Sequence, residues 1–288
     1  MRVYHQRMLQ AAAIILAGGR SSRMGSPKAA LDWHGSTLLR RVTGIAARAV
    51  DGPVVVVRAP GQRLPDLEPA IELVEDAREG RGPLQGLAAG LAAIDGRAEV
   101  AYVSSTDVPL LHPAFVRRVI GAFNDEIDVV LPDIRGYRQP LAAGYRSNLL
   151  DVVEELIAAD RLKPAFLFER CRVLRLSDEA ILRDGALNRL DPGLDSVSNL
   201  NEPADYARAH ALPAPEIRVE RFGTLAPRSG SRRETVRAWT LGEVAARIGV
   251  TLDDHVVAAL NGDQITRQAQ VPLATGDAVA FMAADAGG

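Results

Sequence analysis

The sequence predicts an α/β protein in which a domain built on a mostly parallel sheet is followed by a small α+β domain. Over the first 200 residues, short apolar runs alternate with segments of helical periodicity. Strands that alternate with helices in this way form parallel sheets covered by helices. After the proline-containing stretch 211–215, the alternation ends and a pattern of strands, one helix and a hairpin turn follows.

The first domain is expected to begin with a buried parallel strand over 12–16, a short apolar run that ends at two glycines. Residues 37–49 carry apolar side chains at helical spacing, which predicts an amphipathic helix. The four valines of 54–57 predict a second buried strand. The same reasoning predicts strands over 71–74, 100–104 and 128–131 and helices over 84–94 and 112–123.

The second domain is predicted from different signals. Residues 217–222 alternate like a half-buried strand, and Thr240 with Glu243 forms a capping box before an apolar helical segment. A strand over 256–260 runs into Asn261-Gly262, a strong signal for a hairpin turn. The last strand is expected over 278–282. The predicted organisation is an extension over 1–10, a first domain over 11–210, a linker over 211–215 and a second domain over 216–288.

Composition excludes several classes of function. The chain has 288 residues and a net charge of −2, so no strong basic field attracts nucleic acid. No apolar run approaches the roughly 20 residues of a membrane span, and the apolar run 11–17 is short and lacks a signal-peptide cleavage motif. Cys171 is the only cysteine, which excludes an internal disulfide and fits a reducing cytoplasm. We therefore predict a cytoplasmic protein without nucleic-acid or membrane partners.

The loop 16–28 has the composition of a phosphate-binding loop. Glycines let backbone N–H groups approach a phosphate closely, and Arg20, Arg23 and Lys28 supply positive charge. Lys28 is notable because Lys163 is the only other lysine in the chain. The loop lacks the Gly-Lys-Ser/Thr ending of a Walker motif. A glycine turn with solvated arginines is the alternative interpretation.

This loop, Leu16-Ala-Gly-Gly-Arg-Ser-Ser-Arg-Met-Gly-Ser-Pro-Lys28, resembles the signature of the molybdenum cofactor guanylyltransferases. The resemblance implies a Rossmann-like nucleotidyltransferase fold, with Arg23 and Lys28 acting in catalysis. It also implies a guanylyl-type loop, because relatives that use CTP tend to have Leu-Ala-Ala-Gly where this chain has Leu-Ala-Gly-Gly. The loop residues assigned to nucleotide binding are Leu16, Ala17, Gly18, Gly19, Arg20 and Lys28.

Further matches to this family follow along the chain. The resemblance places Asp76 and the segment Gly82-Pro83-Leu84 at guanine recognition, and a carboxylate suits the guanine N1–H and 2-amino donors. Asp107 ends an apolar strand, where carboxylates commonly hold Mg²⁺ beside substrate phosphates. The family uses this aspartate as its metal ligand, so Asp107 is assigned to catalysis, nucleotide binding and metal binding. A loop carboxylate near Arg78 and a helix-capping aspartate are the alternatives for the two acidic residues.

Two softer matches concern the acceptor. The segment containing Gln139 resembles the family's Gln-Pro-Leu segment, and Asn199-Leu200-Asn201 resembles its Asn-x-Asn segment, which is associated with the pterin substrate. The expected reaction transfers GMP from GTP, with Mg²⁺, to molybdopterin. A cytidylyltransferase for the same pterin, or a transferase for another small phosphate, remains the alternative.

The second domain resembles ubiquitin-like β-grasp sulfur carriers, most of all the small subunit of molybdopterin synthase, with the thiamine sulfur carrier as a relative. The resemblance rests on residues 219–223 and 273–281 and on the terminal Gly287-Gly288. It implies that the terminal carboxylate is activated by an E1-like adenylating enzyme and that the large subunit of molybdopterin synthase is a partner. A docking module whose Gly288 is never activated is the alternative.

Overall fold

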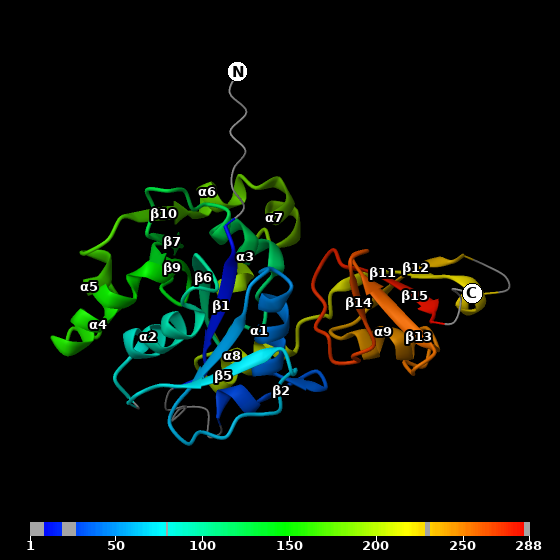
Figure 1. Ribbon diagram of the computed structural model, residues 1–288. Coiled ribbons are helices and arrows are strands. Elements are labelled where there is room, and N and C mark those ends of the chain that lie inside the picture. The colour runs from blue at the N-terminus through cyan, green and yellow to red at the C-terminus, as the bar shows by residue number, and fades with distance from the viewer. Residues whose placement is uncertain (1–8, 19–26, 79, 228–230, 285–288) are drawn as a thin grey trace. The chain divides into compact units, whose positions relative to one another are not determined.

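The computed structural model describes residues 9–18, 27–78, 80–227 and 231–284 of the 288-residue chain (Figure 1). The chain divides into two compact units. The first comprises residues up to Leu31 together with Thr37–Pro203, and the second comprises Asp32–Ser36 together with the residues from Ala204 onward. Among the described helices, none is long and apolar enough to cross a membrane.

A mostly parallel sheet forms the centre of the first unit, as predicted. Its strands lie in the order β10-β7-β9-β6-β1-β4-β5, and β8 pairs with β7. Strands β5, β4, β1 and β6 are parallel neighbours, as are β7 and β10, whereas β9 runs antiparallel between β6 and β7. The strands are β1 (Ala11–Leu16), β4 (Val54–Arg58), β5 (Ile71–Glu75), β6 (Val100–Ser105), β7 (Val129–Ile134), β8 (Tyr137–Arg138), β9 (Ala142–Arg146) and β10 (Val173–Ser177).

Helices pack against the strands of this sheet, with α1 and α2 next to β1 (Figure 1). Helix α1 (Leu38–Ala47) begins after Thr37, whose Oγ1 accepts from the Arg40 backbone N–H. Helix α3 (Pro113–Ile120) begins after His112, whose Nδ1 accepts from the Ala114 N–H, and it is shorter than predicted. The remaining helices of this unit are α2 (Pro83–Ile94), α4 (Leu150–Ala158), α5 (Pro164–Phe168), α6 (Asp178–Leu182) and α7 (Gly185–Leu190), with 3-10 turns η1 (Lys28–Ala30), η2 (Ser147–Leu149) and η3 (Asp195–Val197).

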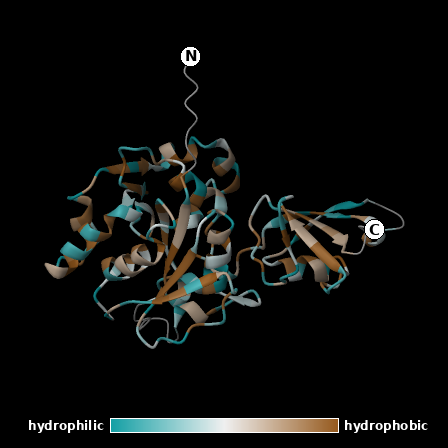
Figure 2. Cartoon of the chain, in the orientation of Figure 1, coloured by the Kyte–Doolittle hydropathy of each residue, from teal (hydrophilic) through white to brown (hydrophobic). Residues whose placement is uncertain are grey.

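The core of the first unit lies between the sheet and its helices. Ile14 is fully buried and joins Leu87 and Leu91 of α2 in one hydrophobic cluster. Ile15, which points to the opposite side of the strand, is also fully buried, as expected for a parallel strand covered on both faces. Figure 2 shows hydrophobic residues on the strands and hydrophilic residues on most of the connecting loops. Because both faces of the sheet are covered, the packed core fixes the positions of the carboxyl ends of its strands.

The second unit contains a five-stranded sheet in the order β12-β11-β15-β13-β14. Strands β11 and β15 are parallel, and the other neighbours are antiparallel. Val244 of α9 packs with Ile217 and Phe281 of the sheet in a separate core. The elements are α8 (Pro203–His210), β11 (Glu216–Arg221), η4 (Gly223–Leu225), β12 (Arg233–Arg237), α9 (Leu241–Arg247), β13 (Val256–Leu260), β14 (Gln264–Thr266) and β15 (Ala278–Ala283).

Two local predictions in the second unit match the geometry. Thr240 caps α9 by accepting from the Glu243 N–H, and Glu243 accepts in return from the Trp239 N–H at 2.8 Å. Asn261 and Gly262 have φ values of 55° and 92° and join β13 to its antiparallel partner β14. Two successive positive φ values are what an Asn-Gly hairpin turn requires. Strand β12, by contrast, was not predicted, because its five residues carry only one aliphatic side chain.

The boundary between the units differs from the predicted linker. Most of α8, which precedes residues 211–215, already belongs to the second unit. So does the short hairpin of β2 (Asp32–Trp33) and β3 (Ser36–Thr37), apart from its last residue. Trp33 is 1% exposed, and its ring centroid lies 5.4 Å from that of Trp239 and 5.7 Å from that of His210. This aromatic packing explains why a segment from the early chain belongs to the second unit.

Candidate active site

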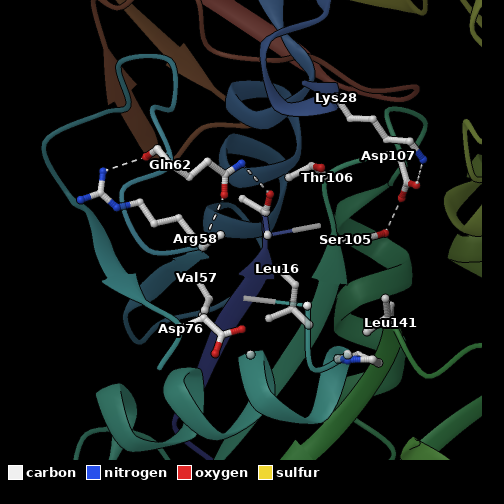
Figure 3. Close-up of a pocket in the computed structure, with 17 residues that line it drawn as sticks. Leu16, Lys28, Val57, Arg58, Gln62, Asp76, Ser105, Thr106, Asp107 and Leu141 are labelled. Atoms are coloured by element: carbon white, nitrogen blue, oxygen red, sulfur yellow. Dashed lines mark hydrogen bonds and ion pairs between the residues drawn. The ribbon is translucent and has the colours of Figure 1, made fainter. Parts of the chain in front are cut away.

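A cavity of about 360 Å³ lies at the carboxyl ends of four neighbouring strands of the first unit (Figure 3). Each strand supplies part of its lining. The ends of parallel strands are where α/β sheets bind ligands. The lining includes Leu16, Ala17 and Gly18 at the end of β1, Arg58 and Gln62 at and beyond the end of β4, Asp76 after β5, and Ser105, Thr106 and Asp107 at the end of β6.

Lys28 and Asp107 meet at one side of this cavity. The Lys28 Nζ lies 2.6 Å from Asp107 Oδ2, and the Ser105 hydroxyl donates to Asp107 Oδ1 at 2.5 Å (Figure 3). Both side chains of the ion pair are largely buried, with exposed fractions of 20% for Lys28 and 14% for Asp107. The carboxylate is therefore held in one orientation at the edge of the cavity.

Gln62 connects the loops that follow β1 and β4. Its Nε2 donates to the Ala17 carbonyl at 3.0 Å, and its Oε1 accepts from the Ala59 N–H at 2.9 Å. Arg58 donates from Nη1 to the Gln62 carbonyl at 3.1 Å and pairs with Glu75 through Nη2 at 2.9 Å. Arg58 and Gln62 were not predicted as site residues. The available signal was their position at the carboxyl end of the valine strand and in the loop that follows it, where α/β sheets bind ligands.

Asp76 is partly buried at the end of β5. Its N–H donates to the Arg58 carbonyl at 2.8 Å, and its Oδ1 accepts from the backbone N–H of Arg78 at 3.2 Å. Burial raises the pKa of the Asp76 carboxyl above its ordinary value, although backbone N–H groups of Arg78 and Ala77 partly oppose this. A carboxylate in this position can accept hydrogen bonds from a ligand in the cavity.

The start of α2 forms another wall. Gly82 has a φ of 83°, a left-handed conformation that favours glycine, and Pro83 begins the helix. Gly82, Pro83 and Gly86 line the cavity. The side chain of Leu84, which was assigned to nucleotide binding, is 1% exposed and packs in the hydrophobic core. Leu84 therefore supports this wall from behind and does not line the cavity.

A second cavity, of about 300 Å³, adjoins the first. It contains all three residues assigned to the acceptor, Gln139, Asn199 and Asn201, and it shares Ser105, Asp107 and Leu141 with the first cavity. The Leu200 N–H donates to the Asp107 carbonyl at 2.8 Å, which brings the Asn-x-Asn segment beside the aspartate. Asp107 thus lies where the two cavities meet.

Some assigned residues lie outside the described parts of the chain. These are Gly19, Arg20 and Arg23 of the glycine-rich loop and Gly287 and Gly288 at the carboxyl terminus.

The described residues contain no group of three or more His, Cys, Asp or Glu side chains suited to hold a metal ion. Mg²⁺, however, is commonly bound by one or two carboxylates together with substrate phosphates. Asp107 offers carboxylate oxygens beside a cavity of suitable size for a nucleotide, so its donor chemistry fits Mg²⁺ bound together with a nucleotide. Asp107 is the described residue that would hold such an ion.

Fold and site together define a class: an α/β enzyme in which a lysine and an aspartate, Lys28 and Asp107, line a ligand cavity at the strand ends. Residues 13–173 match the family described as the MobA-like NTP transferase domain. The chain belongs to this family, and it is a nucleotidyltransferase. The matched range includes Lys28, Asp76 and Asp107, whereas Asn199 and Asn201 follow it.

Curated relatives agree with this membership. The molybdenum cofactor guanylyltransferase of Desulfosudis oleivorans is 32% identical over 199 residues, which cover 69% of this chain and 93% of that protein. A probable molybdenum cofactor guanylyltransferase of Mycobacterium avium is 38% identical over 154 residues, which cover 52% of this chain and 76% of that protein.

A solved structure is similar in fold. The molybdopterin-guanine dinucleotide biosynthesis protein A of Archaeoglobus fulgidus superposes with a TM-score of 0.53 at 23% identity. The similarity covers 69% of this chain and 96% of that one. The likeness supports the mixed α/β fold with a mostly parallel central sheet.

Proposed function

We propose that the first unit transfers GMP from GTP to molybdopterin, forming the guanine dinucleotide form of the cofactor and releasing pyrophosphate. The observation that carries this proposal is the meeting of two cavities at Asp107. A transferase must hold a nucleotide and an acceptor on two sides of one phosphorus atom. The relatives named as molybdenum cofactor guanylyltransferases support the choice of substrates.

The first cavity suits the nucleotide. Asp76 supplies a carboxylate that accepts from the guanine N1–H and 2-amino group, a pair of donors that adenine lacks. The turn at Gly82 and the helix start at Pro83 form the adjoining wall. The phosphates then lie over Gly18 and the glycine-rich loop, toward Lys28.

The residues at the junction suit phosphoryl chemistry. The terminal phosphate of the acceptor is already ionised at neutral pH, so the reaction depends on positioning and charge neutralisation more than on a general base. In the proposed reaction an acceptor phosphate oxygen bonds to the α-phosphorus while the bond to the pyrophosphate oxygen breaks. Lys28 stabilises the charge on the α-phosphate, and Arg23 assists from the loop. Asp107 would hold Mg²⁺, which would supply further neutralisation of the phosphate charge.

The proposal is tested by turnover of GTP with molybdopterin in the wild type, Lys28→Ala and Asp107→Ala. We expect both variants to lose at least about a hundredfold in kcat/KM, because Lys28→Ala loses the positive charge on the α-phosphate and Asp107→Ala loses the proposed metal ligand. Undiminished turnover in both variants would refute the site assignment. Pyrophosphate release with GTP, CTP and ATP tests the base: faster release with CTP would favour the cytidylyltransferase alternative.

For the second unit we propose a β-grasp sulfur carrier that serves molybdopterin synthesis, with Gly288 as the carrier end. Support comes from the strand order β12-β11-β15-β13-β14, with β11 and β15 parallel at the centre and α9 packed on the sheet. A transferase for the same cofactor on the same chain favours molybdopterin over thiamine. The proposed partners are an E1-like adenylating enzyme and the large subunit of molybdopterin synthase.

The test for the second unit is the intact mass of the full chain after incubation with an E1-like adenylating enzyme, ATP and a sulfur donor. We expect conversion of the terminal carboxylate to a thiocarboxylate in the wild type and none in a chain lacking Gly288. An unchanged wild-type mass would favour the docking-module alternative.

A further inference from the structure

We propose that Arg138 binds the terminal phosphate of the acceptor and holds it in line with the α-phosphorus of the nucleotide. This inference rests on the proposed function, in which the acceptor is a phosphate monoester. It adds a residue to the acceptor side, where only the neutral side chains Gln139, Asn199 and Asn201 were assigned.

Arg138 lines the second cavity, which shares Asp107 with the first. Among the residues that line this cavity, Arg138 and Asp107 are the charged ones. Lys28 lines the first cavity only. In the described part of the chain, the positive charges of Lys28 and Arg138 therefore belong to different cavities that share Asp107. Such an arrangement suits a displacement in which the acceptor and the leaving pyrophosphate occupy opposite sides of the phosphorus.

A tight hairpin holds Arg138 in position. Arg138 lies opposite Asp133 in the register of β7 and β8, and the Gln139 N–H donates to the Pro132 carbonyl at 2.9 Å. The turn residues Arg135 and Gly136 have φ values of 54° and 77°, as in a two-residue hairpin turn. The backbone that carries the guanidinium is therefore fixed before any ligand binds.

Arg138 is exposed, and among the described residues its side chain has no hydrogen-bond or ion-pair partner. Other arginines around the first cavity are already engaged: Arg58 pairs with Glu75, and Arg81, on the neighbouring loop, pairs with Asp160. A guanidinium without a carboxylate partner keeps its five donors for a ligand. Asp133 lies opposite Arg138 in the register of β7 and β8, but no hydrogen bond or ion pair joins these two side chains.

The chemistry of the acceptor needs such a group. A phosphate monoester carries a charge of about −1.5 to −2 at pH 7, and it must approach both Asp107 and a triphosphate. Arg138 is the positively charged residue among those that line the second cavity, so it is the group there that can attract the phosphate. The planar guanidinium binds two phosphate oxygens at once, which fixes the orientation of the phosphate as well as neutralising it.

Steady-state kinetics of Arg138→Gln, Arg138→Lys and wild type test the inference. We expect KM for molybdopterin to rise about 10- to 100-fold in Arg138→Gln, as for loss of a charged hydrogen bond, with KM for GTP within about twofold of wild type. Arg138→Lys keeps the charge but loses the bidentate contact, so its KM for molybdopterin should lie between those of wild type and Arg138→Gln. Arg175→Gln is the matched control, because Arg175 is also an exposed strand arginine but lines neither cavity.

Dephosphorylated molybdopterin separates phosphate binding from general damage to the cavity. As a competitive inhibitor it should have the same Ki in Arg138→Gln as in wild type, because it lacks the group that Arg138 binds. A parallel rise in this Ki and in KM for molybdopterin would overturn the inference in favour of a structural role. So would an unchanged KM for molybdopterin in Arg138→Gln.

Binding of molybdopterin, measured by calorimetry with a non-hydrolysable GTP analogue present, distinguishes failure of the inference from failure of the proposed function. Turnover that does not depend on Arg138 overturns the inference alone. Binding that depends on Arg138 without any turnover overturns the proposed function alone. Absence of both binding and turnover in the wild type overturns both.

Discussion

The Asp107 carboxylate has one contact on each oxygen. Ser105 donates to Oδ1, and Lys28 pairs with Oδ2. A largely buried carboxylate that keeps such partners is held in one rotamer, and a metal ion would meet it without reorientation. The Ser105 hydroxyl is neutral. It therefore orients Asp107 without adding a second positive charge that would compete with Lys28 for a phosphate.

Ser105→Ala should therefore weaken the use of magnesium by the enzyme. We expect the Mg²⁺ concentration for half-maximal activity to rise about 3- to 10-fold, as for loss of one hydrogen bond, with KM for GTP at saturating Mg²⁺ nearly unchanged. Metal titrations of activity measure this. Ser105→Thr keeps the hydroxyl and should restore the wild-type value; if it behaves like Ser105→Ala, the hydrogen bond is not the cause.

Asp76→Asn should weaken GTP binding and slightly stabilise the protein. The pKa of Asp76 is raised in the folded state, so its ionised form opposes folding. This cost is fully present above the raised pKa and disappears as pH falls below the unfolded value. At pH 7 we expect a small rise in Tm and a rise of about tenfold or more in KM for GTP.

The pH dependence follows from the same shift. As pH is lowered, kcat/KM for GTP in the wild type should begin to fall at a higher pH than it would if Asp76 had the pKa of an ordinary aspartate. Asp66→Asn is the control, because Asp66 is exposed and lies outside both cavities. A fall in Tm at pH 7 for Asp76→Asn would contradict a raised pKa.

At the scale of elements, the site depends on how closely α2 and the strand-end loops approach one another. Gly90 of α2 lies directly on Ile14 of β1: an added Cβ would lie 2.9 Å from Ile14 Cδ1 and closer still to Cγ2. Gln62 joins the loops after β1 and β4 through two hydrogen bonds. The small residues of α2 therefore let the helix start reach the first cavity.

Gly90→Ala should destabilise the first unit despite the better helix propensity of alanine. Overpacking of a dense core costs about 1–3 kcal/mol, which exceeds the propensity gain of about 1 kcal/mol. Denaturant unfolding with equal m-values measures the difference. Ala92→Ser, on the exposed side of the same helix, is the control and should change stability by less than about 0.5 kcal/mol. An increase in stability of Gly90→Ala would show that Ile14 yields readily.

At the scale of the whole molecule, two separate hydrophobic cores predict two unfolding transitions. Phe115 and Phe281 are both fully buried, one in each unit. Units with their own cores need not unfold together. The segment Asp32–Ser36 belongs to the second unit, although it follows shortly after Lys28 in the sequence.

Trp33→Ala should therefore lower the transition of the second unit in calorimetry of the full chain. Loss of a buried tryptophan costs about 3–5 kcal/mol. Phe281→Ala and Phe115→Ala identify which transition belongs to which unit. The assignment of this hairpin is wrong if Trp33→Ala shifts only the transition that Phe115→Ala shifts.

Much of the fold could be predicted from the sequence because its signals are local. The valine run of 54–57 and the apolar run before Gly18 specify buried strands wherever they pair. The Asn261-Gly262 turn and the Thr240 cap act within a few residues. Strand β9 was missed, because a short run of alanine and glycine carries little strand signal, and its antiparallel position depends on its neighbours.

The sequence by itself determined the α/β class and the residues suited to phosphate chemistry, because periodicity, glycine and charge act through local backbone and burial. Only the tertiary structure decided which of them meet. Lys28 and Asp107 are separated by 79 positions, and Gln62 and Ala17 by 45. Such contacts depend on the strand order β6-β1-β4, which local periodicity does not encode. The assignment of Trp33 to the second unit, and of Leu84 to the core, depended in the same way on long-range packing.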